Sequence, residues 1–221
     1  MNTAMKRILC LTSLLCLLAG CQSSAKKQLA RYETLPAQEQ PNTEKARELN
    51  AEGAKALEKD DLAAAEKTFK DALTQDVFFG PAHNNLGITY SRQKKYYPAA
   101  WEFQYAAKLM PNKSEPRNNL GMIFENVGKA DEAAKCYEEA LKLEPEDVQV
   151  MANLARLRVR HNQCDERTRQ LLSEVILRDQ RPDWVSWARE KLAIMPKESA
   201  SQPCELPITP HKSAETEPSK G

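Results

Sequence analysis

The residues of this chain that are best suited to chemistry are three histidines and six cysteines among 221 residues. The histidines, His83, His161 and His211, lie in three distant segments. The chain contains no His-Glu-x-x-His sequence, no Cys-x-x-Cys pair and no Gly-x-Ser-x-Gly elbow, which mark zinc, thiol and serine chemistry. We therefore expect no enzyme, no cofactor and no metal site, and we interpret His83 as a packed residue rather than a ligand.

Cys21 lies where a covalent modification is expected. Lys6 and Arg7 stand near the start of the chain and are followed by twelve uncharged, mostly apolar residues. A membrane-spanning helix needs about 20 such residues, so the pattern is typical of a secretory signal peptide. Its end, the sequence Leu-Ala-Gly-Cys at 18–21, resembles the lipobox of bacterial lipoproteins. This resemblance implies a signal peptide at 1–20 and a Cys21 that carries acyl chains such as palmitate; the alternative is an ordinary signal peptide followed by a chance cysteine.

The lipoprotein resemblance also implies a location. Gln22 follows the lipidated cysteine, at the place where a residue other than Asp usually directs a Gram-negative lipoprotein to the outer membrane. Two or more acyl chains hold a protein firmly on a bilayer. Residues 21–43 then form the lipidated end and a polar tether that includes Pro36 and Pro41. We expect a protein that is anchored in the outer membrane and faces the periplasm.

The other cysteines allow at most one disulfide bond. The signal peptide and the lipid anchor account for three of the six cysteines, which leaves Cys136, Cys164 and Cys204. Cys164 and Cys204 flank the last helical segment and could form a bridge. Three free thiols agree equally well with the sequence.

The elements that carry these residues recur along the chain at a fixed interval. Each repeat has a glycine, an alanine twelve residues later, an aromatic residue four further on and a second alanine three after that. Small residues inside helices allow a second helix to approach closely, and the aromatic ring fills the space between them. The members of this pattern are Gly53, Ala65, Phe69 and Ala72; Gly87, Ala99, Phe103 and Ala106; and Gly121, Ala133, Tyr137 and Ala140.

The interval from Gly53 to Gly87 and on to Gly121 resembles the period of the tetratricopeptide repeat, a unit of two antiparallel helices and about 34 residues. The resemblance implies an all-α helical solenoid whose three clear repeats occupy 46–79, 80–113 and 114–147, within a region 44–147. Residues 148–195 resemble a degenerate repeat followed by a capping helix, because a solenoid needs a terminal unit to cover its last apolar face. Its tryptophans, Trp184 and Trp187, are interpreted as core residues, with a recognition patch as the alternative. The Pro-rich segment 196–221 has a composition typical of a disordered tail.

Three asparagines share one position of the repeat. Asn85, Asn119 and Asn153 follow one another at the interval of the repeat, each two residues before the small residue of the first helix. First helices line the concave side of such solenoids, and an amide side chain both donates and accepts hydrogen bonds. We therefore predict a ladder that binds the backbone of an extended peptide. The alternative is that each asparagine only pairs with the neighbouring repeat.

A basic stretch follows at the C-terminal end of the predicted groove. No acidic residue lies between Asp147 and Asp165, whereas Arg156, Arg158 and Arg160 do. Arg156 and Arg160 are one helical turn apart and should share a face. Guanidinium groups pair well with carboxylates, so this end of the groove favours an acidic partner segment. A solvated surface without a partner is the alternative.

One known activity of the family is argued against by specific positions. Chaperone-binding tetratricopeptide domains hold a terminal carboxylate with Lys and Asn in the first repeat, Asn in the second, and Lys and Arg in the third. The corresponding residues here are Asn50 and Ala54, then Asn85, then Glu115 and Asn119. Only Asn85 is retained, and Glu115 would repel a carboxylate. We do not expect this activity.

The charge balance and the repeats together predict a binding protein. The 32 Lys and Arg residues balance 31 Asp and Glu residues, so a nucleic-acid partner is not expected. We predict a membrane-anchored scaffold or adaptor that binds other envelope proteins or extended peptides. The anchor and the repeats also resemble, in architecture, the small tetratricopeptide lipoproteins of pilus assembly and secretin localisation. That resemblance implies the alternative of a pilotin-like factor for an outer-membrane pore.

Overall fold

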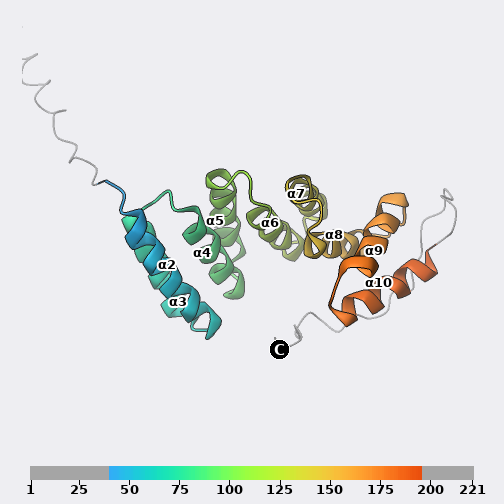
Figure 1. The fold of residues 1–221 in the computed structure, drawn as a ribbon, viewed down its shortest axis with the longest axis horizontal. Coiled ribbons are helices and arrows are strands. Elements are labelled where there is room, and N and C mark those ends of the chain that lie inside the picture. The colour runs from blue at the N-terminus through green and yellow to red at the C-terminus, as the bar shows by residue number, and fades with distance from the viewer. Residues whose placement is uncertain (1–39, 196–221) are drawn as a thin grey trace, which may run out of the picture. The chain divides into compact units, whose positions relative to one another are not determined.

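The computed structural model describes residues 40–195, and within this range the chain forms nine helices and no strand (Figure 1). The predicted signal peptide, Cys21, Cys204, His211 and the Pro-rich segment 196–221 lie outside the described residues. The helices of residues 40–195 are α2 (Thr43–Glu58), α3 (Leu62–Gln75), α4 (Gly80–Arg92), α5 (Tyr96–Leu109), α6 (Glu115–Asn126), α7 (Ala130–Leu143), α8 (Val148–Arg160), α9 (Glu166–Arg178) and α10 (Pro182–Ile194). None of these nine has the length and apolar character that crossing a membrane requires.

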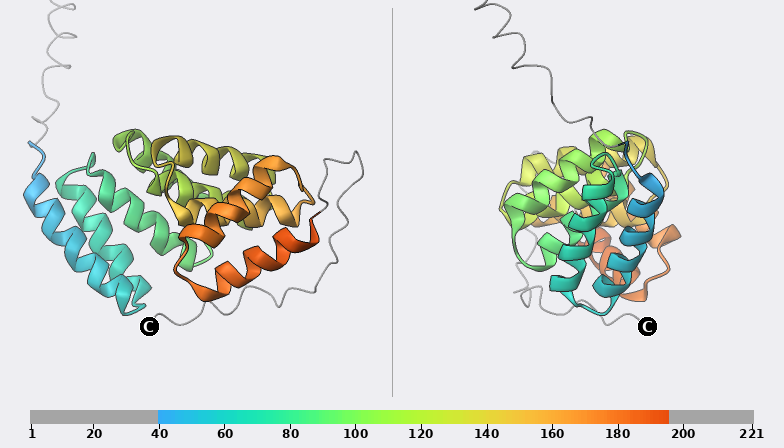
Figure 2. Two further views of the ribbon diagram at one scale, coloured as in Figure 1. Left: turned by 45° about the vertical axis from the view of Figure 1, so that its right-hand side comes forward. Right: turned by 90° about the vertical axis from the view of Figure 1, so that its left-hand side faces the viewer.

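Consecutive helices pack in pairs, and the pairs stack along the chain (Figure 1). The pairs α2–α3, α4–α5 and α6–α7 lie in the segments predicted as the three clear repeats, α8–α9 lies in the segment predicted as the degenerate repeat, and α10 packs on α9 in the position predicted for a cap. First helices also contact the first helices of neighbouring repeats, α2 with α4, α4 with α6 and α6 with α8. Figure 2 shows the same succession from two further sides. The predicted all-α solenoid of helix pairs is confirmed for the described residues.

The core of each repeat is a glycine facing an aromatic ring. A Cβ atom built on Gly53 would lie 2.6 Å from Phe69, one on Gly87 2.7 Å from Phe103, and one on Gly121 2.6 Å from Tyr137. These distances are far shorter than a carbon–carbon contact, so only glycine lets the two helices of a repeat approach this closely. The constant spacing from glycine to ring therefore places the two on facing helices.

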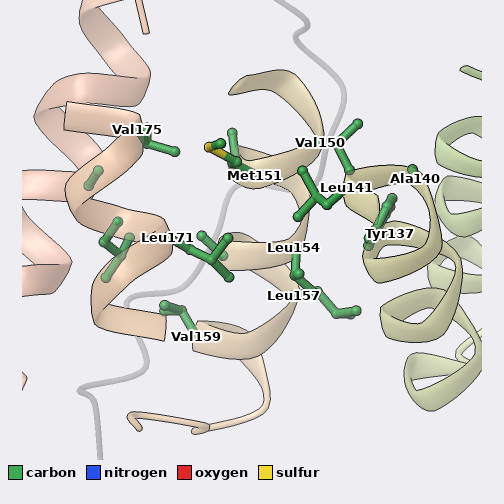
Figure 3. Packing of buried hydrophobic residues seen from close by; sticks show 14 of the residues in the cluster. Tyr137, Ala140, Leu141, Val150, Met151, Leu154, Leu157, Val159, Leu171 and Val175 are labelled. Carbon is green, nitrogen blue, oxygen red and sulfur yellow. The ribbon is translucent and has the colours of Figure 1, made fainter. Parts of the chain in front are cut away.

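The degenerate repeat fills the same space with different residues. Ala155 stands in place of the glycine and Leu171 in place of the ring, and both are buried. The extra methyl group of alanine is accommodated because leucine is smaller than phenylalanine or tyrosine. Figure 3 shows the side chains of α8, Leu154 among them, between Leu141 of α7 and Leu171 of α9. Helix α8 is consequently apolar on both sides and joins the third repeat to the cap.

The cap rests on partly buried tryptophans. Trp184 and Trp187 pack against the cluster formed by α7, α8 and α9, and their rings meet edge to face with centroids 5.6 Å apart. Their interpretation as core residues agrees with this packing. Of the cysteines, Cys136 is free and buried, whereas Cys164 takes part in a disulfide bond, which agrees with one bridge rather than three free thiols.

Candidate functional site

The predicted binding residues all lie on first helices. Asn85 belongs to α4, Asn119 to α6, and Asn153, Arg156 and Arg160 to α8. Because each first helix contacts the next one along the chain, these residues are brought to one side of the stack, which we call the inner side. The inner side is therefore built from α2, α4, α6 and α8.

The three asparagines do lie in a row, but the side-chain nitrogen of each one already donates a hydrogen bond to an asparagine of the preceding repeat. The side-chain nitrogen of Asn85 donates to Asn50 Oδ1 at 2.9 Å, that of Asn119 to Asn84 Oδ1 at 3.1 Å, and that of Asn153 to Asn118 Oδ1 at 3.0 Å. Each bond joins first helices of adjacent repeats, as in the alternative that the sequence left open.

Burial separates the three rungs of this ladder. Asn153 is only 6% exposed, whereas Asn85 and Asn119 are partly exposed. The first two rungs, Asn85 and Asn119, can still present their carboxamide oxygen to a ligand, since the nitrogen is the atom that each bond uses. Asn153 is enclosed, and its role is to hold α8 on α6.

The side chains that accept these hydrogen bonds are a second set of asparagines that recurs at the repeat interval, which the sequence analysis did not identify. Asn84 and Asn118 occupy the same position in consecutive repeats, and each stands directly before a ladder residue in the sequence Asn-Asn-Leu-Gly. Asn84 further donates to Glu115 Oε1 at 2.9 Å. The doubled asparagine was the available signal, because one amide of each pair faces the previous repeat and the other faces the next.

The two predicted arginines share a face and bind one carboxylate. Arg156 lies 3.2 Å and Arg160 2.6 Å from the carboxylate oxygens of Glu125 on α6. The hydroxyl of Tyr137 donates to the same carboxylate at 3.1 Å. Glu125 is a participant that sequence reasoning did not identify, since it lies on the preceding first helix and no charge pattern connects it to the arginines. Two guanidinium groups and one carboxylate leave a net positive charge here.

The aromatic cap extends this basic site. The guanidinium of Arg156 lies 5.6 Å from the ring centre of Trp184, and that of Arg181 lies 5.0 Å from the same ring. Such stacking fixes the orientation of a guanidinium group without neutralising it. Arg158 points elsewhere, toward Asp165 at 2.5 Å. The Arg156, Arg160 and Trp184 side chains consequently form one cluster at the C-terminal end of the inner side.

His83 is a packed residue in the structure. It is 7% exposed, its Nε2 lies 2.8 Å from the carbonyl oxygen of Val77 and its Nδ1 lies 2.6 Å from Glu102. Both ring nitrogens therefore have protein partners. Among the described residues, no group of three or more potential metal ligands comes together.

A shallow pocket of about 410 Å³ lies between the ends of α7, α8 and α9. Leu141, Met151 and Leu171 form its apolar floor. Arg178 at the rim is paired with Glu174 at 2.5 Å and with Glu146 at 3.4 Å. None of the predicted site residues lines this pocket, and its charged rim is internally paired.

Comparison with known proteins gives the same fold. The family described as "Tetratricopeptide repeat" matches residues 114–147, and no curated protein matches the chain. A similar solved structure is the first tetratricopeptide domain of Spaghetti (RPAP3), which was solved with the HSP90 peptide SRMEEVD. It has 22% identity and a TM-score of 0.54, with 56% of this chain and 98% of that one covered.

Two bacterial structures are also similar. A tetratricopeptide repeat protein from Parabacteroides merdae has 18% identity and a TM-score of 0.59, with 69% of this chain and 60% of that one covered. MamA from Desulfovibrio magneticus has 17% identity and a TM-score of 0.55, with 61% and 78% covered. At identities this low, the structural similarity establishes the fold only. What the chain binds must therefore be argued from its own residues.

Proposed function

We propose that this chain, a tetratricopeptide repeat protein, is a scaffold that holds an extended acidic segment of another protein along its inner side. The observation that carries the proposal is the cluster of Arg156 and Arg160 around the single carboxylate of Glu125. Arg160 keeps 56% of its side chain exposed, so it can receive a second carboxylate in bidentate geometry. The role is one of binding rather than catalysis.

The partly exposed asparagines support an extended ligand. The oxygens of Asn85 and Asn119 can accept hydrogen bonds from the backbone of a segment that runs along α4 and α6 toward the arginines. The solved RPAP3 domain carries the peptide SRMEEVD, which contains three acidic residues. Glu115 at the third repeat, held by Asn84 at 2.9 Å, disfavours a terminal carboxylate there. We therefore expect internal acidic residues to be recognised at the α8 end.

The membrane anchor is the second part of the proposal. The resemblance of residues 18–21 to a lipobox supports lipidation of Cys21, attachment to the outer membrane and partners in the cell envelope. Replacing Cys21 with Ala should release the protein from sedimented membranes. If Cys21→Ala remains with the membranes, the lipoprotein assignment is wrong, and the binding proposal stands on its own.

Site-directed crosslinking in intact cells tests the binding site. A photoreactive residue at Asn119 should capture a partner through the inner side, whereas the same residue at Glu139 on α7, outside the inner helices, should not. Changing Arg156 and Arg160 to Gln should reduce the captured partner at least tenfold. The control is Arg167→Gln, since Arg167 on α9 also bonds a glutamate, Glu138, at 2.8 Å. Equal capture by both variants would overturn the proposal.

The pilotin-like alternative makes a different prediction in the same cells. A pilotin delivers one pore-forming protein, so deletion of the chain should misplace that single protein. A scaffold holds several members together, so its deletion should separate a complex while each member keeps its membrane. Fractionation of the captured partners decides between the two.

A further inference from the structure

Helix α5 exposes two large aromatic side chains on its outer surface. Tyr97 is 87% exposed and Trp101 is 70% exposed. They are four residues apart, so they lie next to each other on one face of the helix. Exposed aromatic groups of this size that neighbour one another indicate a surface that another molecule covers.

The sister repeats show that the fold does not require these aromatics. At the positions that correspond to Tyr97 and Trp101, α3 has Ala63 and Lys67, and α7 has Asp131 and Lys135. Both lysines are exposed. The second repeat has thus replaced an ordinary solvated helix face with an aromatic one.

Helix α5 is also poor in charge. Its single acidic residue, Glu102, has a side chain that is 16% exposed and bonded to His83 at 2.6 Å. Helix α5 itself therefore adds little exposed negative charge that would repel an anionic surface.

A second pair of exposed apolar side chains lies in the connection between α3 and α4. Val77 is 46% exposed and Phe78 is 59% exposed, where the next connection has Pro111 and Asn112. His83 joins this connection to α5, because it bonds the Val77 carbonyl at 2.8 Å and meets the ring of Tyr105 edge to face at 4.6 Å.

Tyr105 lies one helical turn after Trp101, so the chain of contacts from the connection through His83 and Tyr105 leads toward the exposed pair. We call Val77, Phe78, Tyr97 and Trp101 the aromatic face.

The start of α2 is bonded to the end of α3, directly before Val77. The N–H of Asn42 donates to the carbonyl of Gln75 at 2.9 Å, and the hydroxyl of Thr43 donates to Asp76 at 2.7 Å. Asp76 directly precedes Val77. The chain from Cys21 to Asn42 can span at most about 75 Å, so a lipidated Cys21 would keep the start of α2 within that distance of the bilayer and would let the aromatic face reach it.

We propose that the aromatic face rests on the lipid bilayer surface and holds the body down beside its own anchor; this rests on the proposed lipid anchor. Tyrosine and tryptophan combine an apolar ring with a polar group and are enriched at the depth of lipid headgroups. Phe78 would insert its ring among the upper acyl segments. Lys94 and Lys108 on either side of the exposed α5 pair are exposed and would contact anionic headgroups. The inner side then remains available to the partner protein.

Vesicle sedimentation tests this without any acyl chain. The probe is residues 22–221, which include every described helix, mixed with vesicles of phosphatidylethanolamine and phosphatidylglycerol. We expect the chain to bind, and the double variant Phe78→Asn with Trp101→Lys to partition about tenfold less. Both substitutions introduce the residue that a sister repeat carries, so the fold should persist, which circular dichroism checks.

The matched control is Leu177→Lys. Leu177 on α9 is 76% exposed, and the change adds the same charge as Trp101→Lys. Binding that is absent in the unaltered chain, or that falls equally in the control, overturns the proposal. Two other outcomes would instead make the face a protein interface. One is a dimer that forms without vesicles and dissociates in the Trp101→Lys variant. The other is loss of the crosslinked partner in that variant. Because no lipidated cysteine is involved, failure here is separate from failure of Cys21→Ala.

Discussion

At the scale of single residues, each repeat depends on the fit between one glycine and one ring. The fourth unit offers a natural comparison, since Ala155 and Leu171 occupy the two places and both are buried. The larger residue at the glycine position is therefore compensated by a smaller side chain at the ring position. This exchange makes a prediction about pairs of substitutions rather than single ones.

Gly87→Ala should destabilise the protein although alanine is the better helix former. The new Cβ would lie 2.7 Å from the buried ring of Phe103, so overpacking of about 2 kcal/mol outweighs a helix-propensity gain of about 1 kcal/mol. Phe103→Leu alone should cost about 1 kcal/mol through the space it leaves. The double variant should be more stable than the sum of the single effects by about 1 kcal/mol, measured by urea unfolding. Strict additivity would contradict the fit.

Cys136 gives a prediction at the same scale that depends on pH. Burial is the main cause that raises the pKa of its thiol to about 11. The thiolate is the reactive form, so at pH 8 alkylation should be about 100-fold slower than for an unfolded cysteine. Because the folded pKa lies above the unfolded value, the stabilisation from this group is complete below about pH 8.5 and is lost toward pH 11. Rapid alkylation of the folded chain at pH 8, followed by mass spectrometry, would show that the site opens.

At the scale of elements, the turn inside each repeat has its own period. Asp60, Lys94, Gly128 and Asn162 all have positive φ, at 58°, 59°, 76° and 54°, and they occupy the same position in the four units. The left-handed region is unfavourable for residues with a Cβ. Glycine adopts this conformation freely and Asn and Asp tolerate it, so the turn of the second repeat, with Lys94, is the most strained of the four.

Lys94→Gly should therefore raise the free energy of unfolding by about 0.5–1 kcal/mol, and Gly128→Lys should lower it by a similar amount. Lys59→Gly is the matched control, because Lys59 has a φ of −83° in the corresponding part of the first repeat and gains nothing from glycine. The three variants can be compared by thermal unfolding. A gain in the control equal to that in Lys94→Gly would assign the effect to something other than φ.

The helix pairs were predictable because the period appears in residue types, whereas the partners across repeats were not. Spacing alone places Asn119 on a first helix, but it does not say that the side chain faces Asn84. Likewise Glu125 lies outside the stretch 156–160, and its pairing with two arginines depends on the offset between helices. The exposure of Trp101 follows from comparing repeats position by position, where the lysines of the sister helices are the signal.

At the scale of the whole molecule, the stack is held together by contacts between neighbouring repeats. In such a solenoid the stability is approximately the sum of the repeats and of the interfaces between them. The amide bonds contribute unequally to those interfaces. Asn153 and Asn118 are 6% and 7% exposed, whereas Asn85 is partly exposed.

Breaking the buried rung should uncouple the C-terminal part from the first three repeats. Asn118→Ala leaves the buried Asn153 amide without its acceptor at 3.0 Å, at a cost of about 1–3 kcal/mol. Hydrogen exchange should then report α8, α9 and α10 opening before α4 and α5. Asn50→Ala removes the acceptor of Asn85, where water can replace it, so the expected loss is below about 0.5 kcal/mol. If the same helices open in both variants, with the same free energy of opening, the two interfaces are equivalent. Burial of the amide pair then does not determine which interface opens first.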